Sequence, residues 1–303
     1  MSERLSPYEK NALAEIHAWK EPELGWFDQP MKVINWPLEQ AGDLIMDTPG
    51  LGDMIRRVVQ GVVSVSNDAA LWSIRPDSIY SEFRDRGHSE IRSPGHVFNL
   101  DIQDVDKAVG WIDAKYKGLA LVEGAVTGVV GLPGIPADII ALVTLNLRAI
   151  GEYATFYGFD ISSQLERLFA MNVLGLASSP SDSAKGVAMA QLVRIAQDVA
   201  KKKAWRELEK HAFVKIIQQI AKALGIRLTK AKLAQTIPIA GAVVGGGFNS
   251  YYTAKVCDAA YNLYRERFLA QKYGPEVIEI TVKPAEQLEP EYGEVSEKIP
   301  EAR

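Results

Sequence analysis

The 303-residue chain contains a single cysteine, Cys257, and no long apolar stretch that is free of charge and proline. One cysteine excludes an intramolecular disulfide, and with it the small secreted proteins that disulfides hold together. A standard transmembrane helix needs roughly 20 apolar residues, so such a span is not predicted. The beginning, Met1-Ser2-Glu3-Arg4, lacks the basic and then apolar layout of a signal peptide. We therefore expect a cytoplasmic protein.

The motifs of several enzyme classes are also absent. No lysine is preceded by glycine or followed by serine or threonine, so the phosphate-binding loop that nucleotide hydrolysis needs is missing. Residues 47–50, Asp-Thr-Pro-Gly, are therefore interpreted as a turn and not as a GTPase switch. The four histidines form no HExxH motif, and Cys257 has no partner at ligand spacing. The sequence predicts neither a metal site nor a cofactor.

The composition is that of a folded soluble protein, with 47% hydrophobic residues, 24% charged residues and a net charge of −4. Charge is unevenly distributed, because residues 194–232 hold eleven basic residues against three acidic ones. Aromatic residues are not interleaved with these lysines and the whole chain is acidic, so nucleic acid is not an expected partner. An anionic membrane surface, or a membrane protein, fits this segment better. The candidate contacts are Lys201, Lys202, Lys203, Arg206, Lys210, Lys230 and Lys232.

The spacing of apolar residues and the positions of residues that start or break helices predict an all-α, multi-helix globular protein. Ser6, Pro7 and Glu9 form a capping box that opens a helix ending near Lys20. Further helices are predicted at 38–46, 51–64, 67–74, 106–116, 137–158, 162–176 and 204–224, and in a segment that ends near 273. Residues 75–100 are interpreted as a loop with one helical stretch around 77–86. We divide the chain into an N-terminal helical region (1–103), a helical domain (104–273) and an acidic tail (274–303) that is expected to be disordered.

Two glycine-rich segments are expected to form helical hairpins in the core. Each combines a GxxxG spacing with a nearby proline, which favours a helix, a turn and a second helix packed closely against the first. The glycines that would allow this close approach are Gly124, Gly128, Gly131, Gly134, Gly241, Gly245 and Gly246.

Charged residues in the most apolar part of the chain are the second notable feature. Glu123 and Asp138 lie on opposite arms of the first hairpin, so packing of the arms would bring them together. Arg148 can pair with Glu152, four residues later on the same helix face. One interpretation is a buried ion-pair network that sets helix register; a second is a polar pocket or a proton-handling carboxylate pair. A third places Asp138 against a membrane.

Several segments resemble the EcsC protein family. They are KGLALVEGAVTGVVGLPGIPAD at 117–138, LRAI at 147–150, YGFD at 157–160, RLTKAK at 227–232, IPIAGA at 237–242 and GGGFN at 245–249. The resemblance covers residues 106–269 and leaves 1–103 and the tail outside. It implies a helical, cytoplasmic bacterial protein, named after a gene beside that of an ABC transporter associated with secretion, and it implies no assigned activity. The positions of family type are Lys117, Glu123, Thr127, Asp138, Arg148, Asp160, Thr229, Lys230 and Asn249.

The leading hypothesis is a non-enzymatic cytoplasmic protein of the EcsC type that acts at the inner face of the membrane, as an accessory to a transporter or to secretion. The alternative is an enzyme or small-molecule binder that uses Glu123, Asp138 and Arg148. A further alternative is a soluble interaction scaffold that uses Trp19, Trp26, Trp36 and Trp72. The sequence does not determine the oligomeric state.

Overall fold

The computed structural model describes residues 5–20, 50–68, 74–127, 132–178, 192, 210–235 and 247–277. Within these ranges the regular structure is helical and no strand is present, which confirms the prediction of an all-α protein. The α-helices are α1 (Pro7–Lys20), α4 (Leu51–Asn67), α5 (Pro76–Asp85), α6 (Pro94–Val97), α7 (Ile102–Val109), α8 (Ile112–Thr127), α9 (Ile135–Phe156), α10 (Gln164–Ala177), α12 (Lys210–Gln235) and α14 (Phe248–Tyr273).

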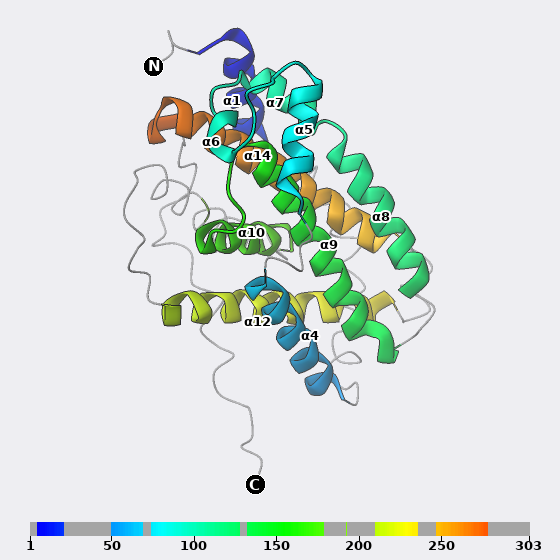
Figure 1. The fold of residues 1–303 in the computed structure, drawn as a ribbon. Coiled ribbons are helices and arrows are strands. Elements are labelled where there is room, and N and C mark those ends of the chain that lie inside the picture. Colours follow the sequence, from blue (N-terminus) through cyan, green and yellow to red (C-terminus); the bar gives the residue numbers. More distant parts are fainter. Residues whose placement is uncertain are drawn as a thin grey trace.

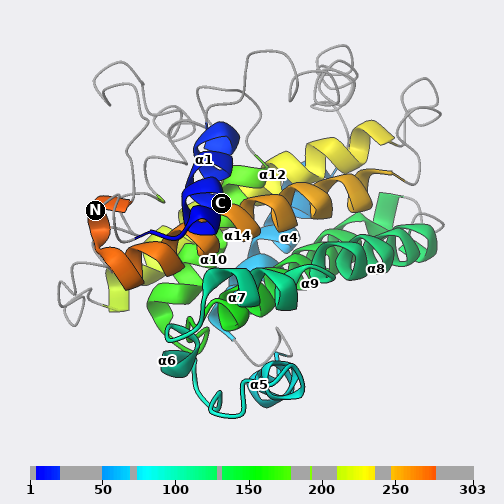
Figure 2. The same cartoon turned by 90° about the horizontal axis from the view of Figure 1, so that it is seen from above.

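Helix α1 begins at the predicted capping box. The Ser6 hydroxyl accepts a hydrogen bond from the Glu9 backbone N–H at 3.2 Å, and the Glu9 carboxylate accepts one from the Ser6 N–H at 2.8 Å. These reciprocal bonds satisfy two donors that the first turn of a helix leaves without partners. The helix then crosses α14 (Figure 2), and Ala12 and Ile16 are buried in the interface.

The centre of the fold is formed by α9 and α14. In Figure 1, α8 runs beside α9, whereas α4 and α12 lie at the opposite end of the molecule from α1, α5 and α7. Every residue of α9 from Asn146 to Phe156 is buried except Arg148. A helix that is apolar around its whole circumference must be surrounded by other helices, and α9 packs against α4, α8, α10, α12 and α14.

Helix α9 ends at the stop signal that residues 157–160 predict. Gly158 has a φ of +82°, and its N–H donates to the Thr155 carbonyl at 3.1 Å while the Phe159 N–H donates to the Ala154 carbonyl at 2.8 Å. This pair of bonds defines a Schellman motif, which favours glycine because the left-handed conformation strains other residues. A Cβ at this position would also lie 2.8 Å from the Pro94 carbonyl oxygen.

One predicted helix is divided in two. The sequence indicated a helix over 106–116, but α7 ends at Val109 and α8 begins at Ile112, with Gly110 between them. Glycine is a poor helix former because it loses more backbone freedom than any other residue. Asp101 opens α7, since its carboxylate accepts a hydrogen bond from the Gln103 N–H at 2.8 Å.

The two glycine-rich turns lie largely outside the described residues, so the expectation of two hairpins in the core is not confirmed. Among the predicted close-packing glycines, Gly128, Gly131, Gly241, Gly245 and Gly246 fall in the ranges that are not described. Gly134 ends a short 3₁₀ turn, Leu132–Gly134, before α9. Helices α8 and α9 also differ from each other, because α9 is enclosed by other helices whereas α8 exposes part of its surface.

Candidate functional site

Four helices each contribute one polar side chain to a cluster next to the two glycine-rich turns. The Lys232 ammonium of α12 lies 2.5 Å from the Asp138 carboxylate of α9 and donates a hydrogen bond to the Asn249 side-chain carbonyl of α14 at 2.5 Å. The Asn249 amide N–H group approaches Asp138 at 3.4 Å. Asp138, Lys232 and Asn249 are each less than a tenth exposed. Lys232 also lies over the ring of Phe248, 5.4 Å from its centroid.

Glu123 of α8 is the fourth member of the cluster. Burial and the nearby negative charge of Asp138 raise its pKa to about 7, although the positive charge of Lys232 acts in the opposite direction. The next residue, Gly124, faces α14, because a Cβ at this position would lie 3.1 Å from the Asn249 side-chain nitrogen. The packing of α8 against α9 thus brings Glu123 and Asp138 close enough for their charges to interact.

Arg148 does not join this cluster. It lies ten residues after Asp138 on α9, about 15 Å along the helix axis, and its guanidinium is 3.7 Å from the Glu152 carboxylate. Lys115 of α8 contacts the same carboxylate at 2.7 Å. The predicted Arg148–Glu152 pair is therefore present, but the proposed grouping of Arg148 with Glu123 and Asp138 needs correction, since helix length separates them and Lys232 occupies the cationic position.

The remaining candidates from the polar set are dispersed. Lys117 pairs with Asp113 on the partly exposed surface of α8, with 2.5 Å between nitrogen and oxygen. Asp160 is exposed and accepts a hydrogen bond from the Ser162 N–H at 2.9 Å, as in a turn. Thr127 is the last residue of α8, and the position of its side chain is not described.

The basic candidates are also divided. Lys201, Lys202, Lys203 and Arg206 lie outside the described residues, and only the backbone of Lys210 is described. Lys230 is half-buried on α12. Lys232, which the sequence placed among the membrane contacts, is instead buried in the ion pair with Asp138.

Helix α8 exposes an apolar surface beside the polar cluster. Leu119, Leu121 and Val122 are 44%, 50% and 66% exposed. Trp111, which directly precedes the first residue of α8, is 39% exposed. Val122 lies beside Gly118 and Leu119 at spacings of four and three residues, and Leu121 lies beside Gly118 at a spacing of three. Leu119 and Leu121 are therefore at opposite edges of the exposed side of α8. Contiguous apolar side chains at a surface are typical of a contact with a protein or a membrane.

Among the described helices, α9 is long and apolar enough to cross a membrane. Most of its surface is buried against other helices, however. Core helices of soluble proteins meet the same criteria of length and composition, so this property alone does not place α9 in a bilayer. Within the described parts of the chain, no group of three or more potential metal-ligating side chains is present.

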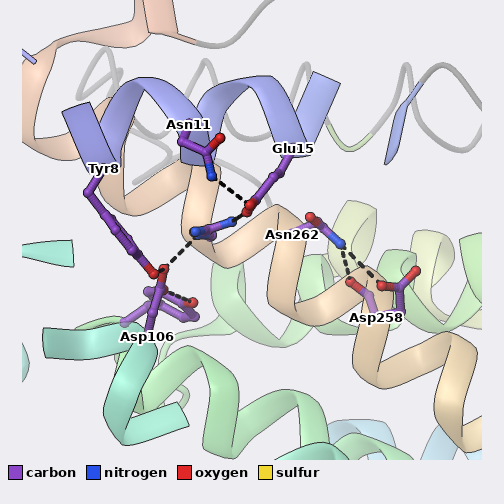
Figure 3. A network of polar contacts seen from close by, with 8 residues as sticks. Tyr8, Asn11, Glu15, Asp106, Asp258 and Asn262 are labelled. Carbon is purple, nitrogen blue, oxygen red and sulfur yellow. Dashed lines mark hydrogen bonds and ion pairs between the residues drawn. The ribbon is translucent and has the colours of Figure 1, made fainter. Parts of the chain in front are cut away.

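A second polar network was missed at the sequence level. Figure 3 shows how Asp106 of α7 accepts hydrogen bonds from the hydroxyls of Tyr8 at 2.9 Å and Tyr157 at 2.7 Å, and from Arg265 of α14 at 2.8 Å. Arg265 also pairs with Glu15 of α1 at 2.6 Å. The network joins the first helix of the chain to the last.

Arg265, Glu266 and Arg267 are consecutive, and all three are buried. Glu266 pairs with Lys20 of α1 at 2.5 Å, and Arg267 forms a bidentate pair with Glu166 of α10 at 2.6 and 2.7 Å. Because neighbouring residues of a helix are 100° apart, three charges in a row cannot share one solvent-exposed face. Their position in the apolar part of 263–269 was the signal that sequence analysis could have used.

The tryptophan and cysteine candidates contribute little to a site. Trp19 donates a hydrogen bond to Asp258 at 2.6 Å, and Trp26, Trp36 and Trp72 lie outside the described residues. Cys257 is fully buried, and burial raises the pKa of its thiol above the ordinary value. A buried neutral thiol is unreactive.

Comparison with known proteins agrees with the resemblance and extends it toward the N-terminus. The chain is 29% identical over 161 residues to the "Uncharacterized protein YdbA" of Bacillus subtilis (strain 168), an alignment that covers 50% of this chain and 54% of that protein. It is 27% identical over 159 residues to "Protein EcsC" of the same organism, covering 52% and 61% of the two chains. The alignments thus span about half to three fifths of these relatives.

No solved structure matches this chain. A model of the EcsC protein family matches residues 10–269, which includes most of α1 and all of α4 to α7 as well as the region from 106 onward. The match covers far more than half of the chain, and the chain therefore belongs to the EcsC protein family.

Proposed function

We propose that this protein is a non-enzymatic, cytoplasmic protein that attaches peripherally to the inner face of the bacterial membrane, as an accessory to a transporter or to secretion. The observation that carries the proposal is the apolar face of α8 formed by Leu119, Leu121 and Val122. An apolar helix face that lies in the boundary between headgroups and acyl chains stabilises attachment by burying its side chains there.

Electrostatic attraction supports the same attachment. The segment 194–232 has an excess of basic residues, and each lysine or arginine near an anionic surface contributes about 1 kcal/mol. Lys232 does not contribute to this attraction, because it is buried in an ion pair with Asp138. The remaining candidates are Lys201, Lys202, Lys203, Arg206, Lys210 and Lys230, of which the three consecutive lysines are the most concentrated charge.

The alternative function, a binding pocket built from Glu123, Asp138 and Arg148, is less well supported. It requires the three side chains to converge, whereas Arg148 contacts Glu152 about 15 Å further along α9 than Asp138. The Asp138 carboxylate is also already paired with the Lys232 ammonium group.

Flotation with phosphatidylglycerol liposomes across a salt series tests the proposed function. We expect binding that weakens as salt rises, because ions screen the attraction. Changing Lys201, Lys202 and Lys203 together to Gln should lower binding. Lys10 of α1, which is exposed and lies outside the basic segment, is changed to Gln as the control and should have a small effect.

A second variant addresses the apolar face. Leu119→Gln with Leu121→Gln should weaken binding roughly tenfold or more, since each leucine that enters the interface contributes up to about 2 kcal/mol. Circular dichroism will establish that the variant is folded. Binding that is absent, or that is unaffected by salt, would contradict the proposal.

A further inference from the structure

Glu123 connects the apolar surface of α8 with the buried polar cluster. It lies four residues after Leu119 and directly after Val122, at the edge of the exposed face, and it is itself half-buried. Its charge interacts with Asp138 and Lys232. An α8 face that entered a bilayer would therefore carry this carboxyl group toward the membrane with it.

We propose that protonation of Glu123 regulates membrane attachment, so that α8 binds the bilayer more strongly when this carboxyl group is neutral. This inference rests on the proposed function and adds a regulatory step to the same surface. Its basis is geometric. Helix α8 exposes Leu121 and Val122, whereas the following Glu123 is half-buried. The next residue, Gly124, lies against the Asn249 side chain, which hydrogen-bonds to both Lys232 and Asp138.

Among the described residues, two charged groups act on Glu123: Asp138 of α9 is negative and Lys232 of α12 is positive. The neutral Asn249 of α14 hydrogen-bonds to both of these groups. With Glu123 ionised, the cluster holds two carboxylates and one ammonium group. With Glu123 protonated, the single pair of Asp138 and Lys232 is balanced, and less charge has to be desolvated when α8 approaches lipid.

The direction of the pH dependence follows from linkage. The pKa of Glu123 is raised to about 7 in the free protein by burial and by Asp138. The bilayer has a lower dielectric constant than water, so contact with lipid raises this pKa further and binding takes up a proton. The partition coefficient should increase as pH falls, by at most tenfold per pH unit for one proton, and should become constant once Glu123 is protonated in both states.

The experiment measures binding to phosphatidylglycerol vesicles at one salt concentration between about pH 8.5 and pH 6. It compares the full chain with Glu123→Gln, which mimics the protonated carboxyl group, and with Glu90→Gln, an exposed loop glutamate as control. The histidines also gain charge over this range, so the readout is the ratio of wild-type to variant binding. With Glu123→Gln as the variant, we expect the ratio of wild-type to variant binding to be well below one at the highest pH and to rise to one at the lowest pH. For Glu90→Gln we expect a ratio that stays near one throughout.

A measurement without vesicles tests the raised pKa of Glu123 by itself, and the vesicle results separate the two proposals. A raised folded-state pKa stabilises the protein at acid pH and this contribution is lost as pH rises through about 7. The Tm of Glu123→Gln should therefore exceed that of the wild type near pH 8, and the difference should shrink as pH falls and disappear below about 4.5, the ordinary pKa of a glutamate. If both proteins bind vesicles and the ratio of wild-type to Glu123→Gln binding does not change with pH, the inference is overturned and the proposed function remains. Absence of binding by both proteins at every pH would overturn both, whatever the Tm values.

Discussion

Lys232 of α12 and Asp138 of α9 form an ion pair with 2.5 Å between nitrogen and oxygen, although 94 residues separate them in the chain. Each side chain is 8% exposed. Removal of water from both charges is costly, and the attraction between them compensates only while both are present. The pair therefore restricts how α9 and α12 can pack against each other.

Replacing Lys232 by Met should destabilise the protein by about 3–5 kcal/mol, because Asp138 would remain buried without its cation. Urea denaturation measures this change. The double variant with Asp138→Leu should recover part of the loss, since it removes the uncompensated charge. Lys222→Met on the exposed face of the same helix is the control; an equal loss in both single variants would contradict a role for the pair.

Replacing Arg265 by Met should have an effect of similar size, about 3–5 kcal/mol, because Asp106 is buried and accepts a hydrogen bond from Arg265 at 2.8 Å. Asp106 keeps its hydrogen bonds from the hydroxyls of Tyr8 and Tyr157. Hydrogen exchange should show that α1 loses protection first, since Arg265 also anchors Glu15. Unchanged protection of α1 would indicate that the helix is held by other contacts. The exposed Arg57→Met provides a comparison with little expected change.

Two glycines of α8 should respond to alanine in opposite directions. A Cβ at Gly118 meets nothing within 4 Å, so Gly118→Ala should stabilise the protein by up to about 1 kcal/mol through helix propensity. A Cβ at Gly124 would lie 3.1 Å from the Asn249 amide, which must shift and weaken its bond to Lys232. Gly124→Ala should therefore destabilise the protein by about 1 kcal/mol. Thermal unfolding of both variants tests this contrast, and stabilisation by both would show that α8 and α14 are not closely packed here.

Glu9 should make the stability of α1 sensitive to acid. Burial acts to raise the pKa of this carboxyl group, but hydrogen bonds from the Ser6 N–H and from Tyr273 and Lys272 outweigh it, so the pKa lies below its ordinary value. A lowered pKa contributes stability above the unfolded-state pKa of about 4.5, and this contribution is lost as pH falls through the folded-state value. Glu9→Gln should therefore lower the Tm near pH 6, with a difference that shrinks near pH 3. A difference that is independent of pH would exclude this origin.

Local signals in the sequence determined the secondary structure to a large extent. The capping box of Ser6 and Glu9 set the start of α1, and Gly158 set the end of α9. Both features depend on hydrogen bonds between residues a few positions apart, which is why they can be recognised without knowledge of the fold. The helix predicted over 106–116 is divided at Gly110, because the low helix propensity of glycine was underestimated.

The partners of the buried charges were decided only by the tertiary structure. The sequence indicated that Glu123 and Asp138 would approach each other across the hairpin and that Arg148 would pair with Glu152, because these relationships follow from a hairpin and from helix periodicity. It did not indicate that Lys232 would complete the cluster, or that Arg265 would bind Asp106 over 159 residues. Such pairs depend on how whole helices pack. The sequence around each lysine of a basic segment does not indicate which of them the packing will bury beside a carboxylate.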